Sequence, residues 1–145
     1  MVNQYITLRS PMNRFVTLWV GVFSSDGMVR FVDAGHGHWL IAGADGPRAP
    51  EHRGGIPLGI DEAFAYESER LELLDDERVV LFTDGAVEQV NGEGEQYGLD
   101  RVVDVLRGTD SPGRDVDALM SALDAWRGAG RLDDDVTIAS LQGAG

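Results

Sequence analysis

The sequence predicts an α+β domain dominated by antiparallel sheet, and two patterns within its 145 residues support this fold class. Short β-branched and aromatic runs, separated by glycine-containing turns, fill the first half of the chain and are typical of strands with tight connections. After residue 99 the apolar residues repeat every three or four positions, as on one face of a helix. Strands first, two helices next and one closing strand favour an α+β arrangement over alternating βαβ units.

The clearest local prediction is a β-hairpin near the start of the chain. Two apolar runs, at 15–23 and 28–33, flank the sequence Ser-Ser-Asp-Gly at 24–27, whose residue types favour tight turns. Their composition predicts two paired strands. Further strands are expected at 39–42, 66–73, 79–82 and 136–141.

Two helices are expected in the second half of the chain. Apolar residues recur at helical spacing over 99–106, which ends near the glycine at 108, and over 116–126, which ends before the glycines at 128 and 130. No repeat or linker interrupts the pattern. Residues 1–145 are therefore expected to form a single domain.

Charge and composition exclude several classes of function. The chain carries 25 acidic and 12 basic residues, a formal net charge of -13, which is the wrong sign for a surface that binds a phosphate backbone. Nucleic acid is therefore not an expected partner. There is no cysteine, and every basic residue is arginine, so thiolate metal sites, cysteine nucleophiles and lysine chemistry have no candidate residue.

No membrane segment is expected. The longest apolar run, at 15–23, is too short to cross a bilayer, and residues 1–14 lack the apolar centre of a signal peptide. Together with the absence of cysteine, this predicts a cytoplasmic protein that does not bind membranes.

Two acidic positions are candidates for chemistry. Asp84 follows an apolar strand and precedes Gly85, so its carboxylate is expected at the end of a sheet. Asp133, Asp134 and Asp135 are adjacent carboxylates before a predicted strand, and their mutual repulsion favours a bound cation. Hard oxygen donors without cysteine indicate Mg²⁺ or Mn²⁺. The alternative is that Asp84 caps a turn and the acidic run is a solvated loop.

Other candidate motifs are less well supported by their context. The Asp-x-Asp-x-Thr pattern at 133–137 lies at the end of the chain and has no accompanying lysine, unlike haloacid-dehalogenase-type phosphatases, and no EF-hand order is present. His36 and His38 could form a zinc pair, but no third ligand is evident nearby. The glycine-rich segment 54–59 lacks a strand-to-helix setting, which favours a structural loop over a phosphate cradle.

Taken in order, five segments resemble the bacterial SpoIIE-type serine/threonine phosphatases, a branch of the protein phosphatase 2C-like (PPM) family that acts in sigma-factor circuits. Each motif is short, but their order is specific, and the resemblance covers nearly the whole chain. Asp33 stands where the family has asparagine. The segments are Phe-Val-Thr-Leu at 15–18 with Gly-Val at 21–22, Asp-Ala-Gly-His at 33–36, Gly-Ile-Pro-Leu-Gly at 55–59, Phe-Thr-Asp-Gly at 82–85 with Glu88, and Asp-Asp-Val-Thr at 134–137.

The resemblance implies an antiparallel β sandwich flanked by helices, with two Mn²⁺ or Mg²⁺ ions in the complete domain. By position, Asp84 and Asp134 would be metal ligands, with Gly85, Asp135 and His36 expected beside them rather than as ligands. A water activated by the metals would attack phosphorus, so no covalent intermediate is needed. The implied substrate is phosphoserine or phosphothreonine on an anti-sigma-factor antagonist protein.

The resemblance also implies that the amino-terminal part of the domain, with further aspartate ligands, has no counterpart in residues 1–145. Residues 1–8 resemble the end of a helix from that part. Two carboxylates offset only half the charge of two dications, so this chain alone is expected to be weakly active or inactive. The competing hypothesis is a non-catalytic, acidic regulatory interaction module that keeps the phosphatase fold. A homodimer through an exposed sheet edge is also expected if strands are missing.

Overall fold

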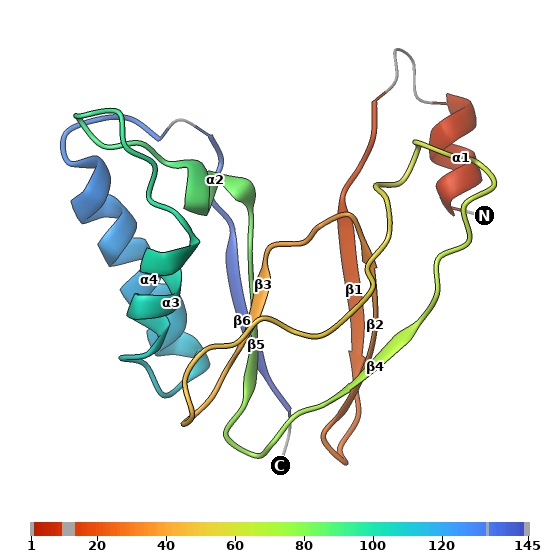
Figure 1. Cartoon of the computed structure of the whole chain (residues 1–145), viewed down its shortest axis with the longest axis horizontal. Coiled ribbons are helices and arrows are strands. Elements are labelled where there is room, and N and C mark those ends of the chain that lie inside the picture. Colours follow the sequence, from red (N-terminus) through yellow and green to blue (C-terminus); the bar gives the residue numbers. More distant parts are fainter. Residues whose placement is uncertain (1, 10–13, 133, 144–145) are drawn as a thin grey trace. The chain divides into compact units, whose positions relative to one another are not determined.

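The computed structural model describes residues 2–9, 14–132 and 134–143. By the contacts within it, the chain divides into two compact units (Figure 1). The first unit comprises residues 1–37 and 51–72, and the second comprises residues 38–50 and 73–144. None of the helices in the described part of the chain has the length and apolar content needed to cross a bilayer.

The first unit contains helix α1 (Val2–Arg9) and a three-stranded antiparallel sheet. The sheet has the strand order β1 (Leu18–Phe23), β2 (Met28–Ala34) and β4 (Glu69–Glu72). Strands β1 and β2 pair from Leu18 opposite Ala34 to Phe23 opposite Val29, which confirms the predicted hairpin. Strand β1 begins at Leu18, three residues later than expected. The backbone of Val16 pairs with that of Leu58 instead of with β2.

Aromatic packing explains why a glycine lies inside β1. The Trp19 indole stacks on the Phe31 ring, with a centroid separation of 5.9 Å and an interplanar angle of 12°. A Cβ atom added at Gly21 would lie 2.4 Å from the Trp19 ring. Gly21 therefore leaves room for the indole to lie across its own strand and reach the neighbouring one.

The second unit contains the other sheet and most of the helical residues. Its antiparallel sheet has the order β3 (Trp39–Ala42), β5 (Arg78–Phe82) and β6 (Ile138–Gln142). Helix α2 (Asp84–Glu88) follows β5, and α3 (Leu99–Leu106) and α4 (Pro112–Arg127) lie beside this sheet (Figure 1). Apolar residues of these strands and helices form one buried core: Leu40, Ala42, Val80, Phe82, Val102, Leu106, Leu119 and Leu123.

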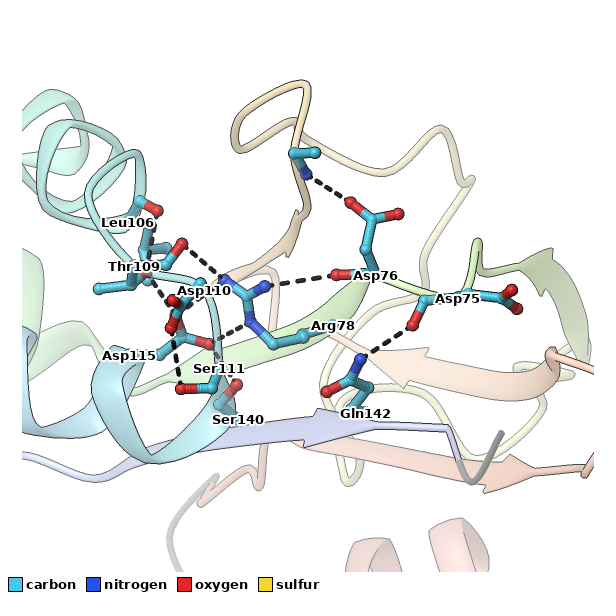
Figure 2. Close-up of polar contacts among 11 residues, drawn as sticks. Asp75, Asp76, Arg78, Leu106, Thr109, Asp110, Ser111, Asp115, Ser140 and Gln142 are labelled. Atoms are coloured by element: carbon cyan, nitrogen blue, oxygen red, sulfur yellow. Dashed lines mark hydrogen bonds and ion pairs between the residues drawn. The ribbon is translucent and has the colours of Figure 1, made fainter.

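A buried ion pair joins the sheet of the second unit to α4 (Figure 2). The Arg78 guanidinium donates from Nε and Nη2 to the two carboxylate oxygens of Asp115, at 2.7 and 2.9 Å. The hydroxyls of Thr109 and Ser140 each donate to Asp115 as well, both at 2.6 Å. The side chains of Arg78 and Asp115 are 3% and 0% exposed, so the charges are removed from water but fully paired.

The predicted α+β class with antiparallel sheets is confirmed, and the differences from the sequence prediction are local. The strand expected at 66–73 is reduced to β4, because the Tyr66 ring packs edge-on against Phe64 and its hydroxyl donates to the carbonyl of Pro57. The closing strand begins two residues later than expected, at Ile138. The short helix α2 was not predicted, since its five residues hold too few apolar positions to show a period.

We expect replacement of Asp115 by alanine to destabilise the protein by about 3–5 kcal/mol, because it leaves the Arg78 guanidinium buried without its partner. Urea denaturation followed by circular dichroism measures this change. Asp117→Ala, at an exposed position on the same helix, is the matched control and should change the free energy of unfolding by less than about 0.5 kcal/mol. Equal stability of the two variants would contradict the expectation.

The homodimer expected from the sequence stays a prediction, and β1 is the strand that would form it. Strand β1 lies at one end of its sheet and carries no charged residue. Leu18, Val20 and Val22 are 40%, 51% and 56% exposed on one face, and such an edge favours pairing with another copy.

We expect Val20→Glu to reduce any concentration-dependent increase in mass measured by sedimentation velocity, because it places a charge on this edge. Leu99→Glu, at a 49% exposed position of α3, is the control and should leave the mass distribution unchanged. A wild-type chain that stays monomeric at high concentration would disprove the homodimer.

Candidate metal centre

Asp84 lies where β5 ends and α2 begins, which is the position expected from the sequence. Thr83 is in extended conformation, and the chain turns into the helix at the next residue. One carboxylate oxygen of Asp84 accepts the backbone N–H of Gly85 at 2.9 Å. The residue is exposed, so this carboxylate is open to a ligand from solution.

Asp134 and Asp135 lie in the segment that leads into β6, and both are exposed. The Asp134 carboxylate accepts the backbone N–H of Asp135 at 2.7 Å. Asp133, the first member of the predicted acidic run, lies outside the described residues.

Thr83 joins these two acidic segments. Its backbone N–H donates to the carbonyl of Thr137 at 3.0 Å, which extends the β5–β6 pairing beyond Phe82 and Ile138. Its hydroxyl donates to the carbonyl of Asp135 at 3.1 Å and accepts the backbone N–H of Thr137 at 3.0 Å. The segment that carries Asp84 is therefore held directly against the segment that carries Asp134.

Gly85 permits the close approach of these segments. A Cβ atom at this buried position would lie 2.6 Å from the backbone oxygen of Asp135 and 3.2 Å from its carbonyl carbon. Any larger residue would push the Asp135 backbone away. Gly85 and Asp135 are both expected beside the metal ligands, and the structure brings these two residues into contact with each other.

The residues at this edge suit a hard divalent cation in chemical type. Carboxylate oxygens are the donors that Mg²⁺ and Mn²⁺ prefer. Within the described residues, however, no three His, Asp or Glu side chains lie close enough together to hold a metal ion. Asp84 and Asp134 offer donors of the right chemical type, but the described residues do not by themselves form a metal site, and the role of these two carboxylates as ligands stays a prediction.

His36 belongs to the first unit, whereas Asp84 and Asp134 belong to the second, and its place beside a metal stays a prediction. The buried Asp33 carboxylate holds the turn that carries His36. It accepts the backbone N–H of His36 at 2.7 Å and lies 3.1 Å from Nε2 of His52. His52 cannot be recognised from the sequence as a partner of Asp33, because it lies 19 residues away and no motif links the two residues.

His38 lies in the second unit, and its ring stacks on Phe82 at a centroid distance of 6.0 Å. The two histidines considered as a zinc pair thus belong to different units, and the pair stays a prediction.

The glycine-rich segment 54–59 is held in place by packing. A Cβ atom at Gly35, which has a positive φ of 74°, would lie 2.6 Å from the Pro57 ring. Leu58 and Val16 exchange two backbone hydrogen bonds of 2.8 and 2.9 Å. These contacts agree with the structural loop that the sequence favoured.

Comparison with known families and structures supports the fold described above. The family model of Stage II sporulation protein E (SpoIIE) matches residues 1–142. The phosphatase domain of SpoIIE from Bacillus subtilis, solved with a fragment of its regulatory domain, is 21% identical with a TM-score of 0.78; the match covers 97% of this chain and 41% of that one. The RsbU and RsbW domains of Rv1364c from Mycobacterium tuberculosis are 24% identical with a TM-score of 0.75, covering 96% and 40%.

A third similar structure, RsbX in complex with magnesium, is 14% identical with a TM-score of 0.65, and the match covers 97% of this chain and 61% of that one. At these identities the likeness shows the fold, and the predicted PPM-type fold is confirmed. The chain spans about two fifths of the length of the first two solved chains. No curated protein sequence matches it.

We expect Gly85→Ala to destabilise the second unit by about 1–3 kcal/mol, because the added methyl group overlaps the Asp135 carbonyl. Urea denaturation measures the change. Gly92→Ala is the matched control, since a Cβ atom there meets nothing within 4 Å and its stability should be nearly that of the wild type. If both variants unfolded at the same urea concentration, the close approach of Gly85 to the Asp135 carbonyl would not affect stability, which would contradict the expectation.

Proposed function

The chain belongs to the SpoIIE family, and from this premise we propose that it is the carboxy-terminal portion of a metal-dependent serine/threonine protein phosphatase domain. The observation that carries the proposal is the joining of the Asp84 and Asp134 segments through Thr83. It gathers hard oxygen donors at one edge of the second unit's sheet, as a hydrolytic site that uses Mn²⁺ or Mg²⁺ requires.

The chain's own residues have defined tasks in this proposal. The carboxylates of Asp84 and Asp134 would hold the cations, while Thr83 and Gly85 keep the two acidic segments together. Divalent cations held there would supply Lewis-acid chemistry, by lowering the pKa of a water and screening the charge of the phosphate. The chain has no cysteine, so hydrolysis by a thiolate nucleophile has no candidate in it.

The proposed substrate is a phosphorylated anti-sigma-factor antagonist, as the family resemblance implies. One similar structure combines RsbU and RsbW domains, and another is described as a cell fate determinant, which supports a role in regulation. On its own, this chain is proposed to be weakly active or inactive. Its two carboxylate ligands carry two negative charges against the four positive charges of two divalent ions.

A second candidate function is a non-catalytic regulatory interaction module that keeps the fold. The net charge of -13 favours it, because an acidic surface of this strength can bind a basic partner without any metal. The two functions differ in whether Asp84 binds a cation.

Titration with Mn²⁺, followed by calorimetry, distinguishes them. We expect the wild-type chain to bind Mn²⁺ and Asp84→Asn to bind it at least about tenfold more weakly, because the substitution removes a full charge from the ligand. Asp104→Asn, at an exposed position of α3, is the control for net charge and should retain binding. Wild-type binding that is absent, or unchanged in Asp84→Asn, would favour the interaction module.

A phosphatase assay with Mn²⁺ on a phosphorylated antagonist peptide tests the expected level of activity. Slow or undetectable hydrolysis is the expected result. Robust turnover by the 145-residue chain would show that its own residues complete the site.

A further inference from the structure

A groove of about 420 Å³ lies entirely within the second unit, between the Val90–Gly92 turn and the end of α4 with the segment that follows it. Its second side is formed by residues 126–131. None of the residues that line it is acidic, although 25 of the 145 residues of the chain are. The groove therefore has a charge opposite to that of the chain as a whole.

Three arginines belong to this region: Arg127 and Arg131 line the groove, and Arg101 contacts the indole of Trp126, another lining residue. Arg101 lies over the indole, with its central carbon 4.1 Å from the ring centroid. Arg127 is held in a fixed orientation, since it donates to the Asp124 carboxylate at 2.8 and 3.0 Å and to the carbonyl of Gly130 at 3.1 Å. Arg131 is exposed and forms no ion pair within the described part of the chain.

Two acidic side chains beside these arginines have partners, whereas Asp134 follows Arg131 by three residues in the chain. Asp124 pairs with Arg127, and the Glu95 carboxylate accepts a hydrogen bond from the Asn91 amide at 3.5 Å. Tyr97 packs edge-on against Trp126, and burial raises the pKa of its phenol, so it adds no negative charge at neutral pH. Of the two arginines that line the groove, Arg127 is paired with Asp124, whereas Arg131 has no ion pair within the described residues.

Two features link the groove to the segments that carry the candidate metal ligands. One is the short stretch of chain between Arg131 and Asp134, and the other is the buried side chain of Gln89. Arg131 precedes Asp134 by three residues, so at most about 11 Å of extended chain separates them. Gln89, which directly follows the helix that begins at Asp84, is 1% exposed. Its amide donates to the carbonyl of Val90 at 3.0 Å and to that of Arg131 at 3.5 Å.

We propose that this groove binds an acidic peptide segment, with Arg131 pairing with its carboxylates and the Trp126 indole packing against its backbone. A chain of net charge -13 repels an anionic protein, so a local cluster of arginines is needed wherever one docks. A guanidinium binds a carboxylate through two parallel hydrogen bonds, which makes arginine suited to this task. That the peptide flanks the phosphorylated residue of the substrate rests on the proposed function, whereas its binding requires no metal.

The test uses two fluorescein-labelled peptides that differ only in their flanks. One has Asp and Glu there, and the other has Asn and Gln at the same positions. Binding is measured by fluorescence anisotropy in the presence of EDTA. We expect the wild-type chain to bind the acidic peptide at least about tenfold more tightly than the neutral one, and Arg131→Glu to abolish this preference. Added salt should weaken the preference in the wild type.

Arg114→Glu is the matched control, because it makes the same change of net charge at an exposed position on α4, where Arg114 pairs with Asp110 at 3.5 Å. It should retain the preference for the acidic peptide. Equal binding of the two peptides by the wild type, or equal loss in the two variants, would overturn the proposal. Urea denaturation of both variants shows whether the fold is preserved.

The Mn²⁺ titration separates this proposal from the proposed function. If the chain binds the acidic peptide through Arg131 but does not bind Mn²⁺, the peptide-binding proposal is supported and the proposed phosphatase function is contradicted. If the chain binds Mn²⁺ through Asp84 but shows no preference for the acidic peptide, the proposed phosphatase function is supported and the peptide-binding proposal is contradicted.

Discussion

The pairing of β5 with β6 is the constraint on which the second unit depends. Side-chain contacts hold the two strands together in addition to their backbone pairing. Arg78, the first residue of β5, and Ser140, the middle residue of β6, both bind Asp115, and just beyond the other end of β5 Thr83 binds the backbone on either side of Val136. A shift of one residue would turn every side chain of β5 to the opposite face and break both sets of contacts. The register of these two strands therefore decides where Asp84 lies relative to Asp134.

Charge is distributed unevenly between the two units. The first unit holds eight acidic residues and five arginines, whereas the second holds 17 acidic residues and seven arginines. The unit with the stronger negative charge is the one that carries the candidate metal centre, which favours the approach of cations and opposes that of a phosphorylated protein. The groove beside Trp126 is lined by two arginines and by no acidic residue, so its lining differs in charge from the rest of this unit.

The sequence predicted the regular elements well where packing agreed with the local pattern. Strand β3 and helix α3 have the predicted bounds, because both are apolar at the positions that the period requires. Strand β4 is shorter than predicted because an alternating pattern cannot show that the Tyr66 ring packs on Phe64 outside the sheet. For the candidate site, the two acidic residues Asp84 and Asp134 and the glycine Gly85 can be recognised from the order of the motifs. The contact of Thr83 with Asp135 was not, since the residues are 52 positions apart.

The sequence by itself determined the α+β class, the family and the two acidic positions, because periodicity, turn residues and motif order are properties of neighbouring residues. Only the tertiary structure showed that Asp115 pairs with Arg78 in the core, although both appear in the sequence as ordinary charged residues. Only the structure gathered Arg127, Arg131 and Trp126 into one groove with the Val90–Gly92 turn. These arrangements depend on contacts between segments more than 30 residues apart, and no local pattern encodes which distant side chain will compensate a buried charge.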